Sequence, residues 1–201
     1  MLNLDQVFNH FPQITTSRLI LRQITLSDAD AHFGLFSKPE VMAGHGLEPY
    51  TERTQSEELI GWYRSAFLER KAMRWAIIHK IDDKLIGTCG LHRLRLGHHR
   101  AEIGYELDPN YWRQGLSSEA VWGVLRFAFE IAGFHRIEAI VDPANKASAA
   151  LLRKVGFTEE GFLRERFYDG EKDQFVDDWF FSILKPEFEQ LYHLKQNNGD
   201  E

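Results

Sequence analysis

Residues 106–120 read "ELDPNYWRQGLSSEA", and this stretch decides how the chain folds. Before it lies an alternating strand pattern, "RAEIGYEL" (100–107). After it comes a helical pattern, "SSEAVWGVLRFAFEIA" (117–132), which Gly133 ends. A further strand pattern, "HRIEAIV" (135–141), follows the helix. A strand, a helix and a second strand in this order predict a right-handed crossover between two parallel strands.

Elsewhere, short turns between strand patterns predict antiparallel pairing. One meander ends with the strand just described, and a later hairpin closes around Asp169-Gly170. Together they predict an α+β (mixed α/β) fold with one central mixed sheet, mostly antiparallel, flanked by helices. The strand patterns are "RLILRQI" (18–24), "MRWAIIHKI" (73–81), "KLIGTCGLHRLRL" (84–96), "FLRERFY" (162–168) and "QFVDDWFFSIL" (174–184).

Three further segments carry helix signals. Ser27 is the predicted N-cap of "LSDADAHFGLF" (26–36). Thr54 and Glu57 fit a capping box that leads into "ELIGWYRSAFLERK" (58–71). Gly156 closes the helical pattern "NKASAALLRKVGF" (145–157).

Length and composition indicate one domain. The 201 residues are 43% hydrophobic, which supports a large core and excludes a disordered chain. We expect a single domain over residues 1–201, with a packed core over about 14–185. The last residues, "KQNNGDE" (195–201), are expected to form a frayed tail.

Several function classes are disfavoured. A net charge of −6 argues against non-specific nucleic-acid binding. The one cysteine, Cys89, cannot form an internal disulfide. No apolar run approaches the ~18 residues of a membrane span, and the N-terminus lacks a signal-peptide pattern. We expect a cytoplasmic protein with no membrane or nucleic-acid partner. His92, His98 and His99 lack metal-ligand spacing, so no metal is expected.

The start of the helix at 117–132 has the character of an anion site. A helix N-terminus carries unpaired N–H groups and a partial positive charge. Gly115 lets the backbone approach a phosphate closely, and Ser117 and Ser118 are small. The alternative is an ordinary helix start capped by one of these serines. The segment is neither a P-loop nor a dinucleotide fingerprint, since the required glycines are missing.

The same segment resembles the acetyl-CoA pyrophosphate-binding segment of the GNAT N-acetyltransferases. Trp112 and Ser117 depart from the general pattern, and both departures are similar to the branch that acetylates N-termini of ribosomal proteins. Arg113 replaces the first glycine of that branch's segment. The matching residues are Leu107, Pro109, Gly115, Glu119 and Ala120.

Two other segments resemble that family in the same order. "NKASAALLRKVGF" is similar to its downstream helix, and "TTSRLILRQITLSDAD" (15–30) to its first strand and helix. The resemblance covers about 14–185. It implies acetyl-CoA as co-substrate, held where two parallel strands splay apart. The residues it places at acetyl-CoA are Leu107, Trp112, Arg113, Gln114, Gly115, Leu116, Ser117, Ser118, Asn145 and Ser148.

The resemblance also implies catalytic roles. The backbone N–H of Leu107 would polarise the acetyl carbonyl. Many GNAT enzymes use a tyrosine to protonate the leaving thiolate, but Leu152 stands at that position. In the ribosomal-protein branch the serine one turn earlier, here Ser148, takes this role. The alternative for Ser148 is a helix serine bonded to a backbone carbonyl. Asn145 would bond pantetheine, cap its helix, or do both.

A base must take the proton of the incoming amine. Glu106, beside the thioester position, is the first candidate, and its alternative is a solvated strand carboxylate. Glu165 and Asp169 on the closing hairpin are weaker candidates. An α-amine with a pKa near ~7.8 costs only about 1 kcal/mol to neutralise at pH 7, whereas a lysine costs roughly 4–5 kcal/mol. A protein N-terminus therefore tolerates a weak base.

The leading hypothesis is acetyl transfer from acetyl-CoA to a primary amine by direct attack in a ternary complex. A protein N-terminus, as of a ribosomal protein, is the first acceptor, and a small amine such as a polyamine, amino acid or aminoglycoside is the second. Other classes are a silent acyl-CoA-binding module, suggested by Leu152, and a nucleotide-binding regulator. The loop 38–50 would wall the acceptor site. "FVDDWFF" (175–181) fits either the core or a homodimer surface.

Overall fold

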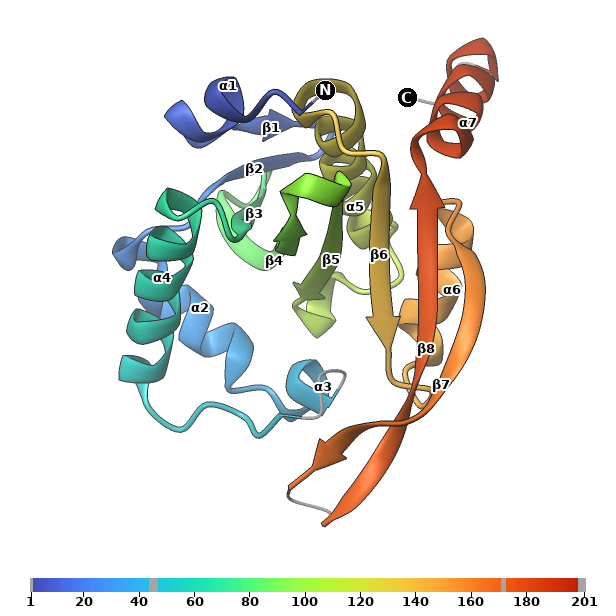
Figure 1. Cartoon of the computed structure of the whole chain (residues 1–201). Helices are drawn as coiled ribbons and strands as arrows, with labels where there is room; N and C mark the ends of the chain where they lie inside the picture. The colour runs from blue at the N-terminus through green and yellow to red at the C-terminus, as the bar shows by residue number, and fades with distance from the viewer. Residues whose placement is uncertain (1, 44–46, 171–172, 199–201) are drawn as a thin grey trace.

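The computed structural model describes residues 2–43, 47–170 and 173–198. Its centre is an eight-stranded sheet with the order β1-β2-β3-β4-β5-β6-β8-β7 (Figure 1). Neighbouring strands are antiparallel except β5 and β6, which run parallel. This confirms the predicted mixed α/β class. The strands are β1 (Ile14–Thr15), β2 (Leu19–Gln23), β3 (Met73–His79), β4 (Lys84–Arg95), β5 (Arg100–Leu107), β6 (Arg136–Val141), β7 (Thr158–Asp169) and β8 (Gln174–Leu184).

The predicted crossover connects β5 to β6 through one long helical segment. The α-helix α5 (Leu116–Arg126) continues as the π-helical segment η5 (Phe127–Ala132). Gly133 ends it with a φ of 81°, a left-handed conformation that glycine adopts at low cost. The meander β3–β4–β5 and the hairpin β7–β8 also form as predicted.

Helices cover both faces of the sheet because the strands are apolar on both faces. In β3, Trp75 and Ile77 pack in the core beneath α5, and the Trp75 ring meets Phe127 edge-on. Ala76 and Ile78 point the other way and pack with Ile60 of α4. Figure 1 shows α2 and α4 on one side of the sheet and α5 on the other. The remaining helices are α1 (Leu4–Asn9), α2 (Ala29–Phe36), α3 (Pro39–Met42), α4 (Arg53–Leu68), α6 (Lys146–Lys154) and α7 (Lys185–Asn198).

Two predicted helix caps are wrong by two residues. The capping box before α2 uses Thr25 and Asp28 rather than Ser27, and a 3-10 turn, η1 (Leu26–Asp28), precedes the helix. The box at the start of α4 pairs Glu52 with Gln55 instead of Thr54 with Glu57. Both pairs keep the spacing that lets two side chains satisfy each other's backbone N–H groups.

Both ends of the chain contribute to the core. Val7 of α1 and Phe188 of α7 are buried in the main apolar cluster, so packing extends beyond residues 14–185. Part of the expected tail, residues 195–198, belongs to α7, and residues 199–201 lie outside the described part. In β8, Phe181 is buried whereas Phe175 is exposed. Among the described residues, no helix is both long and apolar enough to cross a bilayer.

Candidate active site

A cavity of about 870 Å³ opens where β5 and β6 separate. The two strands pair only at Arg100–Glu102 with Arg136–Glu138, which confirms the predicted splayed pair. Beyond that point the β5 residues 103–107 and the β6 residues 139–141 line the cavity. The predicted site residues along its wall are Glu106, Leu107, Trp112, Arg113, Gly115, Leu116, Ser117, Ser118, Asn145 and Ser148.

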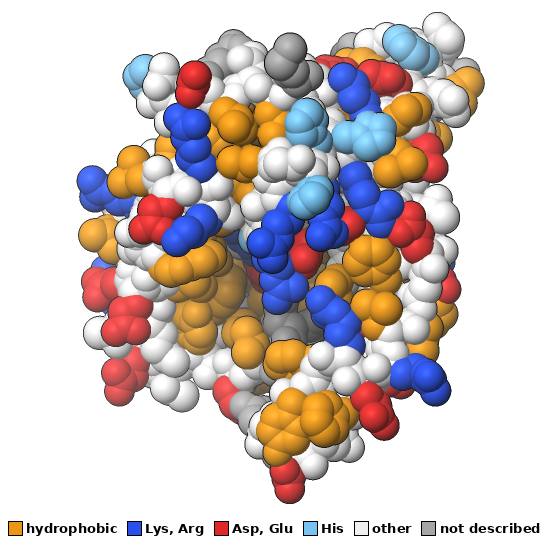
Figure 2. All heavy atoms as spheres, in the orientation of Figure 1, with side chains coloured by type: hydrophobic (Ala, Val, Ile, Leu, Met, Phe, Trp, Pro, Cys, Tyr) orange, Lys and Arg blue, Asp and Glu red, His pale blue; other side chains and the backbone are white. Residues whose placement is uncertain are grey.

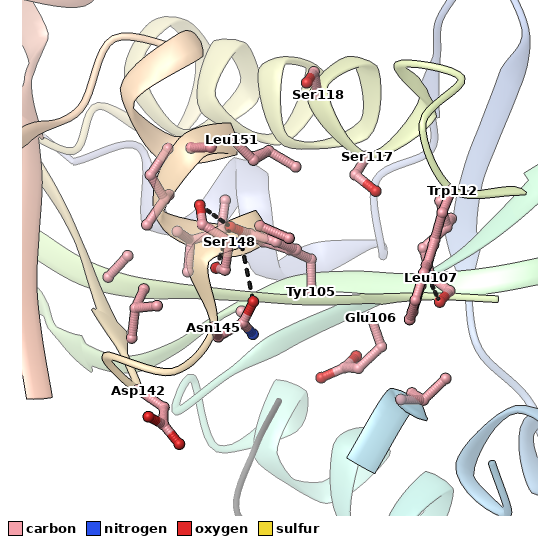
Figure 3. Close-up of a pocket in the computed structure, with 18 of the residues that line it drawn as sticks. Tyr105, Glu106, Leu107, Trp112, Ser117, Ser118, Asp142, Asn145, Ser148 and Leu151 are labelled. Carbon is pink, nitrogen blue, oxygen red and sulfur yellow. Dashed lines mark hydrogen bonds between the residues drawn. The ribbon is translucent and has the colours of Figure 1, made fainter. Parts of the chain in front are cut away.

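The cavity has two sides, which face opposite surfaces of β5. On the α5–α6 side lie Tyr105, the loop and first turn at 113–118, Asn145 and Ser148. On the α3 side lie Glu106, Glu102, His92 and residues 40, 41 and 43. Figure 3 shows Tyr105 and Glu106 on opposite faces of the strand, as alternation along a strand requires.

The start of α5 presents unpaired backbone N–H groups to the cavity. Gly115 is the N-cap, with a φ of 78°, and the Glu119 N–H makes the first helical bond, to the Gly115 carbonyl at 3.0 Å. The N–H groups of Leu116, Ser117 and Ser118 therefore have no partner within the helix. The alternative that Ser117 or Ser118 caps the helix is wrong, since α5 starts before both and its N-cap has no side chain.

An ion pair between α5 and the connection that joins β1 to β2 holds this helix start in place. Glu119 accepts hydrogen bonds from the Thr16 hydroxyl at 2.6 Å, the Arg18 N–H at 2.8 Å and the Arg18 Nε at 2.7 Å. Arg18 also donates to the Gln114 carbonyl at 2.9 Å. Burial opposes ionisation of Glu119, but the Thr16 and Arg18 hydrogen bonds outweigh it and lower the pKa of its carboxyl.

Gln114 differs from the other predicted cofactor residues because it lies outside the cavity lining. Its side-chain nitrogen donates to the Asn110 carbonyl at 3.1 Å, and its own carbonyl is held by Arg18. It therefore shapes the loop through its backbone. The contacts of Thr16 and Arg18 with Glu119 were not predicted, because they span 103 and 101 positions of the sequence and no local pattern links them.

The end of β5 is closed by an indole. Trp112 donates from Nε1 to the Leu107 carbonyl at 2.7 Å, and Leu107 itself is buried. The next residue, Asp108, donates its N–H to Ile86 of β4 at 2.7 Å. Because an antiparallel strand alternates its backbone groups, the Leu107 N–H and carbonyl face away from β4, toward the gap.

Ser148 is held from two sides at the start of α6. Asn145 is the N-cap, and its Oδ1 accepts the Ser148 N–H at 3.0 Å, so one predicted role of Asn145 is observed. The Ser148 Oγ lies 2.8 Å from the Tyr105 hydroxyl rather than on a helix carbonyl. Figure 3 shows the Tyr105 ring reaching from β5 to the serine. Leu152, one turn on, is fully buried and lines the same cavity.

Glu106 is a buried carboxylate rather than a solvated one. Its Oε2 accepts from Arg74 and from the Thr88 hydroxyl, the latter at 2.5 Å. Arg74 also donates to the Gly104 carbonyl at 3.0 Å and to Thr88 Oγ1 at 3.0 Å. The guanidinium lies against Gly104, where a Cβ would come within 3.3 Å of Arg74 Nη1. The arrangement holds one carboxylate on the α3 side in a fixed orientation.

The rest of the α3 side mixes both charge signs. Glu102 accepts a hydrogen bond from Arg93 at 3.0 Å. Burial tends to raise the pKa of its carboxyl, but His92 and Arg93 outweigh burial, so the pKa is lowered. Lys38 and Asp108 form an ion pair at 2.5 Å that ties the expected acceptor loop to the end of β5. Residues 44–46 of that loop lie outside the described residues. Figure 2 shows basic side chains gathered mid-face with acidic ones between them.

The weaker predicted candidates lie elsewhere. Glu165 and Asp169 are on β7 and do not line the cavity. Glu165 has a φ of 50° at a register irregularity in the hairpin, and its N–H donates to Asp177 at 2.7 Å. In the described part of the chain, His, Cys, Asp and Glu side chains form no group of three that could hold a metal ion.

Comparison with known proteins gives the family. Residues 18–158 match the family model of the acetyltransferase (GNAT) domain. The uncharacterized N-acetyltransferase YoaA of Bacillus subtilis is 42% identical over 176 residues, which is 88% of this chain and 98% of that protein. The [ribosomal protein uS5]-alanine N-acetyltransferase of Escherichia coli is 25% identical over 160 residues, 76% of this chain and 81% of that protein.

A solved structure shares the fold. Spermidine N-acetyltransferase from Vibrio cholerae, in complex with CoA and spermine, superposes with a TM-score of 0.74 at 25% identity. The match covers 86% of this chain and 99% of that one. The cavity between the splayed strands, the open helix start at Gly115 and these matches agree, and the chain belongs to the GNAT family of N-acetyltransferases.

Proposed function

We propose that this enzyme acetylates the α-amine of a protein N-terminus, such as that of a ribosomal protein, using acetyl-CoA. The observation that carries the proposal is the cavity that runs through the open sheet, with unpaired N–H groups on the α5–α6 side and the Glu106 carboxylate on the α3 side. An acyl donor and an amine can meet there from opposite faces of β5.

Each side then has its own task. Backbone N–H groups at 113–118 hold the pyrophosphate, and the Arg113 guanidinium adds a charge-assisted contact. The pantetheine arm lies along β5 against Trp112 and Asn145, and the Leu107 N–H polarises the acetyl carbonyl. Because the indole of Trp112 already donates to the Leu107 carbonyl, the group that this residue offers the acetyl-CoA is its N–H.

Proton transfer is divided between the two sides. Glu106 takes the proton that the attacking amine loses, directly or through water. Ser148 protonates the sulfur as the C–S bond breaks, since Leu152 has no proton to give. No metal enters this scheme. A carboxylate held by Arg74 is a weak base, which suits an α-amine better than a lysine side chain.

A small polyamine is the second candidate acceptor, supported by the spermidine N-acetyltransferase neighbour. The charges of the α3 side favour an N-terminus instead. Two of its carboxylates, Glu102 and Glu106, are each paired with an arginine. The loop at 38–50 carries Lys38 beside its acidic residues. A site for a polycation would need unpaired carboxylates there.

The test is a thiol-release assay with acetyl-CoA and a panel of amines. The panel contains peptides with free Ser or Ala N-termini, the same peptides with blocked N-termini and an internal lysine, polyamines and aminoglycosides. Cys89 adds no background, because burial raises the pKa of its thiol to about 12. We expect release only with free N-termini.

Other outcomes of the assay point to the competing functions. Release only with small amines would replace this acceptor class with the second. Binding of acetyl-CoA with no release on any amine would indicate a silent acyl-CoA-binding module. Competition by ATP at equal affinity with CoA would indicate a nucleotide-binding regulator.

A further inference from the structure

The hydroxyl of Tyr105 is neither the acid nor the base of the proposed transfer, yet it contacts the acid directly. Tyr105 lies on β5, and its ring crosses the gap to α6, where its Oη is 2.8 Å from Ser148 Oγ. The phenol oxygen also lies 3.5 Å from the Ser148 carbonyl. Both side chains line the cavity, on the face of β5 opposite Glu106 (Figure 3).

Ser148 alone is a poor proton donor, because an aliphatic hydroxyl holds its proton more tightly than a phenol does. A hydrogen-bond partner that gives Ser148 a new proton as the serine loses its own removes this difficulty. When Tyr105 donates to Ser148 Oγ, the serine's own hydrogen is left to point into the cavity. The Asn145 cap fixes the Ser148 backbone, so the Oγ position depends on only one rotatable bond.

We propose that Tyr105 is a positioning residue that orients the Ser148 hydroxyl toward the CoA sulfur and refills its proton during transfer. The inference rests on the proposed function and adds the residue behind its acid. The phenol would then come from Tyr105 on β5, because α6 carries Leu152 at the position where many GNAT enzymes have a tyrosine.

The step balances. The amine nitrogen forms a bond to the acetyl carbon, the C–S bond breaks, and its electron pair leaves with sulfur. Sulfur takes the Ser148 proton, Ser148 takes the Tyr105 proton, and the phenolate recovers a proton from water in the cavity. The surplus proton of the amine leaves through Glu106, so acetyl-CoA and amine give amide and free CoA thiol.

The surroundings of the phenol suit this role. Burial raises the pKa of Tyr105 well above its ordinary value, and the Ser148 hydrogen bond offsets this only in part. The phenol therefore stays protonated until Ser148 gives its own proton to the developing thiolate. The ring itself is packed against the main core, so removal of the hydroxyl leaves the packing in place.

The test combines single-turnover acetyl transfer with CoA binding in Y105F, S148A and the double variant. Tyr192→Phe serves as control, since Tyr192 stacks on Phe188 in α7, away from the cavity. We expect Y105F to slow transfer by about tenfold or more, near the lower end of general acid catalysis, with CoA affinity unchanged. The double variant should be no slower than S148A, because the two hydroxyls act as a unit.

A second measurement keeps the inference testable if Y105F fails to fold. Fluorotyrosine at position 105 keeps the shape of the ring and lowers the pKa of the phenol, and we expect faster transfer. An unchanged rate in Y105F, losses that multiply in the double variant, or no response to fluorination would overturn the inference alone. A parent enzyme that acetylates no amine in the panel would overturn the proposed function and this inference together.

Discussion

The two sides of the cavity are built in different ways. The α5–α6 side consists of backbone N–H groups, hydroxyls and an amide, held by a glycine turn, a helix cap and the Arg18–Glu119 pair. The α3 side consists of carboxylates held by arginines that come from other strands. Backbone geometry, which tolerates many sequences, shapes the first side, whereas the second side depends on particular charged side chains.

The largest expected effect lies on the α3 side. Glu106→Gln should lower turnover by roughly 10²-fold or more, in the range of general base catalysis, while CoA affinity stays the same. The unfolding free energy should also fall, since Arg74 loses its buried partner. Steady-state kinetics and CoA titration check both parts.

Glu160→Gln is the matched control for Glu106, because Glu160 is also paired with an arginine, Arg136, but lies outside the cavity lining. Its turnover should equal that of the parent. If Glu106→Gln weakened CoA binding as much as it slowed turnover, the two sides would not be separate.

A smaller effect is expected on the α5–α6 side. Gly115 has a φ of 78°, and a side chain in this conformation costs about 1–2 kcal/mol. In Gly115→Ala the free loop relaxes to another conformation, which CoA binding must reverse, so CoA affinity should weaken by about tenfold. Calorimetry with CoA measures it.

Gly61→Ala in α4 is the matched control, since a Cβ at Gly61 would meet no atom within 4 Å and the helix tolerates it. CoA affinity should not change there. Unchanged CoA affinity in Gly115→Ala would remove the assignment of the helix start to the pyrophosphate.

The smallest effect concerns the Arg18–Glu119 pair. A hydrogen bond to a charged group contributes about 1.5–3 kcal/mol. Glu119→Gln weakens such bonds without removing them all, so we expect CoA affinity to fall only several-fold. The pair acts on the loop from outside the cavity lining. Glu130→Gln is the control, because Glu130 pairs with Arg126 on the exposed side of the same helical segment.

The same variant has a defined pH dependence. The pKa of Glu119 is lowered in the folded state, so its carboxylate contributes stability above the unfolded pKa of about 4.3 and loses it as pH falls through the folded value. The difference in unfolding free energy between parent and Glu119→Gln should therefore shrink on acidification. Urea unfolding at several pH values measures it, and a constant difference would contradict the stated role.

Most of the α5–α6 side could be predicted from the sequence because its parts are local. Gly115, the serines that follow it and the Asn145–Ser148 cap are each contained in a few consecutive residues. The order of strand, helix and strand fixed the parallel pair, since right-handed crossovers have few alternatives. The predicted caps of α2 and α4 were each two residues off, because several nearby side chains can satisfy the same N–H groups. Local patterns therefore locate a helix start only to within a few residues.

Only the tertiary structure decided the remaining contacts. Glu106 meets Arg74 across 32 positions, Arg18 meets Gln114 across 96, and Tyr105 meets Ser148 across 43. Such pairs depend on strand register and on the angle at which a helix crosses the sheet, which no local pattern encodes. The sequence by itself determined the fold class and the glycine-led start of α5. Packing of distant strands decided which carboxylate is buried, which serine has a phenol behind it and which arginine holds the loop.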